Sequence, residues 1–175
     1  VFDEALLPLQ TENPKIHVLR QILCSLIRSI LTKFVKPSAM LYKSLKDVQY
    51  KELCNQKDDN ELVIGEAARD FLKKKTENHL RGSRIIDFYV NVRKYFIIIT
   101  DYYMVKLPFD DPYLIAAEVT NPDHQTSAST ENLRYFVNKF PALIPPSATV
   151  DSIIEQFTFH QSTDLRDCEN VHSHV

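Results

Sequence analysis

The stretch from Ile85 to Leu107, IIDFYVNVRKYFIIITDYYMVKL, is the longest apolar segment of the chain. Its tyrosines and β-branched residues favour a buried strand by propensity, most strongly over Tyr95–Thr100. Four polar residues favour a helix instead, because at helical spacing they fall in one narrow stripe along an otherwise apolar helix: Asp87, Asn91, Lys94 and Asp101. Ser83 is the expected N-cap, and Pro108 ends the segment. We therefore predict a long central helix over about 84–106, buried on most of its sides.

The same segment does not suit a membrane span. Four charged residues interrupt it, and each would cost about 2.5–3.5 kcal/mol at the middle of a bilayer: Asp87, Arg93, Lys94 and Asp101. The longest run without a charge, Tyr95–Thr100, is far too short to cross. The sequence therefore predicts no membrane partner.

The composition is that of an ordinary globular protein. With 175 residues, 44% hydrophobic and 25% charged, the chain is long enough for one domain with a core. Only two glycines, Gly65 and Gly82, argue against phosphate-binding loops and tight hairpins. A formal net charge of −2 gives no global attraction to nucleic acid, so binding would need a local patch. Three widely spaced cysteines favour a reducing, intracellular location.

Apolar periodicity, capping residues and prolines predict the remaining helices. Beyond a short helix in 1–10, they are 14–36, 38–48, 61–75, 112–119, 129–140 and 149–160, with a polar loop at 55–60. We expect residues 1–160 to form one all-α, irregular domain of about six to eight helices around the long central helix, and residues 161–175 to form a disordered tail. Because the chain starts at Val1 inside a helical pattern, we expect it to be a piece of a longer protein.

We find no catalytic or metal-binding constellation in the sequence. No G-x-S-x-G motif is present. The nearest metal set is a C-x3-H-x-H triplet in the tail, one ligand short of a structural zinc site: Cys168, His172 and His174. The acidic pairs Asp58-Asp59 and Asp110-Asp111 could bind a divalent cation, but helix capping and loop solvation explain them more simply. We therefore predict no catalytic residue, no metal, no cofactor and no small-molecule substrate.

One cluster of basic residues is a candidate nucleic-acid contact: Lys73, Lys74, Lys75, Arg81 and Arg84. A handful of phosphate contacts would give weak, salt-sensitive binding. A solvated helix end, where the lysines complement the helix dipole, is the commoner explanation of such a run. Three tyrosines could also stack on bases, although their place in the most apolar helix favours core packing: Tyr95, Tyr102 and Tyr103.

Four phrases, taken in their order and spacing, resemble hAT-superfamily transposases and the cellular proteins derived from them. The phrases are IHVLRQILCSLIRSILTKFVKP (16–37), NELVIGEAARDFL (60–72), DFYVNVRKYFIIITDYYMVKLPF (87–109), and NLRYFVNKFPALIP (132–145) followed by IIEQFTFHQSTDL (153–165). Together they cover nearly the whole chain. Each phrase alone is only an amphipathic helix, so the specificity of the resemblance lies in their succession.

The resemblance implies a helical domain that is inserted between the second and third catalytic acidic residues of an RNase H-like domain. Two of those residues would precede Val1 and the third would follow Val175, and no acidic residue here matches any of them. The family's zinc finger and its Cys-x-x-His motif have no counterpart in this sequence. The tryptophan that family members use beside a flipped base is also missing, because the chain contains no tryptophan.

The resemblance thus implies a nuclear, non-catalytic piece of a hAT-like transposase or of a domesticated derivative. Its expected role is to scaffold DNA or a second protomer around a catalytic core that lies elsewhere. The alternative is a protein–protein interaction module, left from a transposon, that binds no DNA. The net charge of −2 and the lack of a dominant basic stripe favour this alternative.

Overall fold

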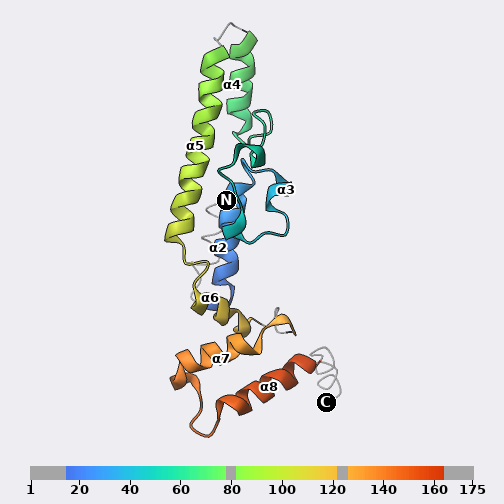
Figure 1. The fold of residues 1–175 in the computed structure, drawn as a ribbon, viewed down its shortest axis with the longest axis vertical. Helices are drawn as coiled ribbons and strands as arrows, with labels where there is room; N and C mark the ends of the chain where they lie inside the picture. Colours follow the sequence, from blue (N-terminus) through green and yellow to red (C-terminus); the bar gives the residue numbers. More distant parts are fainter. Residues whose placement is uncertain (1–14, 78–81, 122–125, 164–175) are drawn as a thin grey trace, which may run out of the picture. The chain divides into compact units, whose positions relative to one another are not determined.

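The computed structural model describes residues 15–77, 82–121 and 126–163 (Figure 1). These residues form seven α-helices joined by turns and short 3-10 helices, and their only β-pairing is one isolated bridge. The helices are α2 (Ile16–Leu31), α3 (Pro37–Met40), α4 (Glu66–Glu77), α5 (Gly82–Lys106), α6 (Pro112–Ala117), α7 (Thr130–Lys139) and α8 (Val150–Ser162). The predicted all-α class is confirmed, and the strand alternative for 95–100 is wrong.

The described residues divide into two compact units. Unit 1 contains residues 21–77 and 82–109, and unit 2 contains residues 15–20, 110–121 and 126–163. The predicted limits of one domain at 1–160 and a disordered tail at 161–175 stay predictions, because residues 1–14 and 164–175 lie outside the described residues. In the described part of the chain, no helix has the length and apolar character needed to cross a membrane.

The core of unit 1 gathers at the C-terminal end of α2. Phe34 has no solvent exposure, and its ring stacks on Phe96 of α5 with the centroids 5.5 Å apart. The backbone N–H of Lys57 donates to the carbonyl of Phe34 at 2.8 Å. The N–H of Val63 donates to the carbonyl of Lys33 at 2.9 Å. Residues 57 and 63 therefore hold the segment just after α2 by main-chain hydrogen bonds.

These hydrogen bonds explain where the predictions for 14–48 are wrong. The first helix ends at Leu31, because residues 33–36 pair with 55–57 and 63 instead of continuing the helix. The predicted helix 38–48 is only α3 and a 3-10 turn at Leu45–Asp47. Between them Tyr42 has a φ of 57°, in the left-handed region that a continuing helix excludes. Leu45 and Val48 are buried, as expected of apolar periodic residues, but they lie in this 3-10 turn and directly after it, not in an α-helix.

The helix predicted at 61–75 begins later, at Glu66. Leu62 is fully buried in the preceding loop, and its carbonyl accepts a hydrogen bond from Arg69 at 2.6 Å. Gly65 has a φ of 85°, a conformation that costs glycine little and other residues considerably more. This glycine therefore lets the chain turn into α4 from the loop that carries the buried Leu62.

The predicted central helix is confirmed as α5, which begins at Gly82 and runs to Lys106. Ser83 lies inside this helix, so its predicted N-cap role is wrong. The prediction that the helix is buried on most sides is also wrong. Among its described residues only Thr100 is buried, and six apolar residues are exposed: Ile86, Val90, Tyr95, Ile98, Tyr102 and Val105. Within unit 1, the neighbouring segments bury only one side of α5.

Side-chain caps begin the three α-helices of unit 2, α6, α7 and α8. The side chain of Asp111 accepts from the N–H of Tyr113, and that of Ser129 accepts from the N–H of Glu131. Thr149 caps α8 in a reciprocal capping box with Ser152. Val119, Leu133 and Val137 are buried together, with partly buried residues of α7, α8 and the connection between them packed around them: Phe136, Ile144, Val150, Ile153, Ile154 and Phe157.

Candidate functional site

The predicted nucleic-acid residues lie where α4 ends and α5 begins. Lys73 and Lys74 are exposed near the end of α4, and Arg84 is exposed in the first turn of α5. Lys75 also belongs to α4, whereas Arg81 lies outside the described residues. Figure 1 shows α4 and α5 running in opposite directions, so Lys73, Lys74, Lys75 and Arg84 belong to the ends of the two helices that lie side by side. Their contact with nucleic acid stays a prediction.

The excess of positive over negative charge in this part of the sequence is small. Between residues 70 and 87 the sequence holds five basic residues and three acidic ones: Asp70, Glu77 and Asp87. A patch of this size supports a few phosphate contacts, whose contribution falls steeply with added salt. Any contact of this kind would therefore be weak and salt-sensitive.

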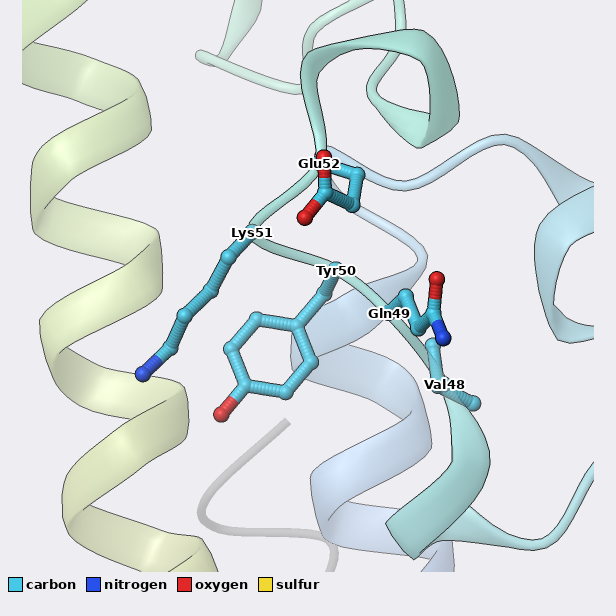
Figure 2. A pocket seen from close by; sticks show the side chains of 5 residues that line it. All are labelled: Val48, Gln49, Tyr50, Lys51 and Glu52. Carbon is cyan, nitrogen blue, oxygen red and sulfur yellow. The ribbon is translucent and has the colours of Figure 1, made fainter.

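A second cluster, which the sequence analysis missed, joins a loop to α5. The hydroxyl of Tyr50 donates to Asp101 Oδ1 at 2.5 Å, and Lys51 Nζ lies 2.9 Å from Asp101 Oδ2. Figure 2 shows the Tyr50 and Lys51 side chains extending from their loop toward the neighbouring helix. The ring of Tyr50 also meets Phe34 edge-on, with centroids 6.3 Å apart. No signal in the sequence pairs these residues, because 51 positions separate Tyr50 from Asp101.

The protonation states follow from these contacts. Burial, the hydrogen bond to Asp101 and the charge of its carboxylate all raise the pKa of Tyr50 well above the usual value of 10. Partial burial alone would raise the pKa of Asp101, but the Tyr50 hydrogen bond and the Lys51 ammonium lower it below the usual value. Tyr50 is therefore a neutral donor and Asp101 an ionised acceptor at neutral pH. This arrangement holds a loop against a helix.

A hollow lies beside this cluster. It encloses about 340 Å³ and is lined by five consecutive residues of one loop, Val48–Glu52 (Figure 2). Beneath the loop, the Nε2 of Gln56 donates to the carbonyls of Tyr50 and Lys51 at 3.0 and 3.3 Å. These bonds fix the loop backbone. Within the described ranges, no three His, Cys, Asp or Glu side chains come together as metal ligands.

The acidic pairs have structural partners. The carboxylate of Asp59 pairs with Arg93 of α5, whose other guanidinium nitrogen donates to the carbonyl of Lys57 at 2.8 Å. Asp111 caps α6, as described above. The simpler explanation by capping and loop contacts thus accounts for one member of each pair. The C-x3-H-x-H triplet, Cys168, His172 and His174, lies outside the described residues.

The outward side of α5 exposes a row of apolar side chains. Five exposed residues repeat there at intervals of four and three: Asn91, Tyr95, Ile98, Tyr102 and Val105. We call these five residues the outer seam. Its apolar members are 61%, 66%, 58% and 80% exposed, in chain order. A contiguous exposed apolar surface marks an interaction site more often than scattered single residues do. The sequence analysis assigned the four apolar members to core packing and placed Asn91 in the polar stripe, and so missed the seam.

Comparison of the chain with protein-family models, with curated proteins and with solved structures returns no match.

Proposed function

We propose that this chain is a non-catalytic helical scaffold that binds another protein through the outer seam of α5. The observation that supports the proposal is the exposure of four apolar side chains at coiled-coil spacing on a helix of 25 residues. Full burial of one such side chain contributes about 1.5–3 kcal/mol, so a partner helix would gain substantially by covering the seam. Recognition of a helix by another helix uses this spacing.

For the whole protein, we propose a hAT-like transposase or a domesticated derivative, in which this chain is the helical insertion beside a catalytic core located elsewhere. The support is the succession of four phrases from 16–37 to 153–165. A nuclear location belongs to the same proposal. The experiment is to determine the reading frame on both sides of Val1 and Val175. An acidic triad and a zinc finger in the flanks would support the transposase, and flanks that encode an unrelated domain would contradict this part of the proposal.

Protein binding is tested with the full chain immobilised and exposed to a nuclear extract. The variant Ile98→Glu/Tyr102→Glu should capture less protein than the parent chain, because two negative charges now lie in the seam. The matched control is Leu41→Glu/Tyr42→Glu, which places the same charges on exposed apolar residues of a loop, where Tyr42 is 99% exposed. Captured proteins are quantified by mass spectrometry, and circular dichroism confirms equal helix content. Equal capture by the seam variant and the control would contradict the proposal.

A second candidate function, DNA binding, has support from the basic residues at the adjacent ends of α4 and α5. Its test is an electrophoretic titration with duplex DNA at low and moderate salt. The variant with Lys73, Lys74 and Lys75 all changed to glutamate should release DNA, whereas the same change at Lys43, Lys106 and Lys139 serves as a control of equal net charge. Equal DNA retention by both variants would exclude the α4–α5 end as the contact.

A further inference from the structure

We propose that the partner of the outer seam is a second copy of this chain, with the two α5 helices packed antiparallel. This inference rests on the proposed function, because it assumes that the seam binds protein. It adds the identity of the partner and the register of the two helices. The spacing of the seam, the sizes of its side chains and the charges beside it support this choice.

The outward side of α5 follows a heptad pattern. With Phe88 included, which is half-buried, the positions Phe88, Tyr95 and Tyr102 correspond to a, and Asn91, Ile98 and Val105 to d. From residue 88 to residue 105, every a position is therefore aromatic, and every d position holds a smaller side chain. A two-helix interface with this spacing places these residues along its centre.

The sizes of the side chains favour an antiparallel pair. In a parallel pair each residue faces its own copy, so layers of two aromatic side chains would alternate with layers of two smaller ones, which spaces the helices unevenly. In an antiparallel pair a positions face d positions. Tyr95 then lies against Ile98 of the second copy, Tyr102 against Asn91, and Phe88 against Val105. Each layer combines one large and one smaller side chain, and the Tyr102 hydroxyl meets an amide with which it can hydrogen bond.

The charges beside the seam are complementary in the same register. Lys94 and Asp101 both occupy g positions, on the same edge of the outward side. Antiparallel pairing brings g positions together, so Lys94 of each copy lies near Asp101 of the other. Lys94 is exposed, and the Asp101 side chain remains 40% exposed despite its contacts with Tyr50 and Lys51. A twofold-symmetric dimer would form this pair twice.

The first experiment measures self-association of the full chain by sedimentation equilibrium from about 1 µM to about 1 mM. We expect a reversible monomer–dimer equilibrium. Ile98→Glu should raise the dimer dissociation constant about a hundredfold, because each dimer would contain two carboxylates facing apolar side chains. Tyr42→Glu should leave the constant unchanged. A chain that stays monomeric over the whole range would overturn the inference.

The second experiment tests the register by mixing two variants. Tyr95→Lys and Ile98→Glu should each dimerise poorly alone, but their mixture should form a heterodimer, because the new lysine faces the new glutamate while the other Tyr95–Ile98 layer stays intact. Tyr102→Lys mixed with Ile98→Glu carries the same charges, but its lysine faces Asn91, so it should restore less. Equal restoration in both mixtures, or none, would overturn the antiparallel register.

The outcomes separate this inference from the proposed function. A monomeric chain whose seam still captures a different protein would refute the second copy as partner and leave protein binding through α5 intact. A monomeric chain whose capture does not depend on the seam would refute both.

Discussion

The contact of Tyr50 with Asp101 gives a sharp test of how unit 1 is held together. Tyr50→Phe removes only the hydroxyl that donates to Asp101 at 2.5 Å and keeps the ring in place beside Phe34. A hydrogen bond to a charged group contributes about 1.5–3 kcal/mol when water is excluded. The Asp101 side chain is 40% exposed and retains Lys51, so water can replace part of the lost bond. We expect the variant to lose about 1 kcal/mol of unfolding free energy at neutral pH.

Acid should reduce this difference. The Tyr50 and Lys51 contacts lower the pKa of Asp101 despite its partial burial. The folded state therefore binds the carboxyl proton of Asp101 less tightly than the unfolded chain does. The stability from these contacts is therefore present above the pKa of Asp101 in the unfolded chain, about 3.9. It is lost as the pH falls through the lower pKa of Asp101 in the folded state. Because Tyr50→Phe removes one cause of the lowering, the variant should lose less stability on acidification than the parent chain.

The measurement is urea unfolding followed by circular dichroism, combined with amide hydrogen exchange of α5 peptides, which reports unit 1 separately. The control is Tyr135→Phe, which removes a hydroxyl from an exposed tyrosine of unit 2 and should change nothing in α5. An unchanged stability of Tyr50→Phe at neutral pH would refute the reasoning. So would a difference between parent and variant that grows as the pH falls.

Three further substitutions test individual elements. Phe34→Ala should cost about 3–5 kcal/mol in urea unfolding, because it leaves a cavity against Phe96, and a loss below about 1 kcal/mol would contradict the assigned core. Thr149→Ala should weaken the start of α8 by about 1 kcal/mol, seen as faster amide exchange in 150–153, and unchanged exchange would show that the cap is dispensable. Gly65→Ala should cost about 1–2 kcal/mol in urea unfolding because of its φ of 85°, although no atom lies within 4 Å of the added methyl, and a stabilised variant would contradict that conformation.

The features that the sequence predicted correctly depend on near neighbours along the chain. Asp111 caps α6 by accepting from an N–H only two positions away, so the capping expected of its acidic pair depends on neighbouring residues alone. The span of α5 was predictable for the same reason, since proline and helical periodicity act locally. Local physical chemistry therefore determined the helical class and the limits of several helices.

The features that the sequence did not predict depend on residues far apart. The end of α2 is set by hydrogen bonds from 33–36 to 55–57 and 63, which replaced the continuous helix expected there. The partner of Asp101 lies 51 positions away, and no periodicity identifies it.

The outer seam depends both on neighbours in the sequence and on distant contacts. The sequence alone determined that Tyr95, Ile98 and Tyr102 share a helix, because their spacing suits its period. It could not determine whether a neighbouring element covers them, since burial depends on how many segments pack around the helix. Only the tertiary structure showed that unit 1 buries one side of α5 and leaves the seam exposed.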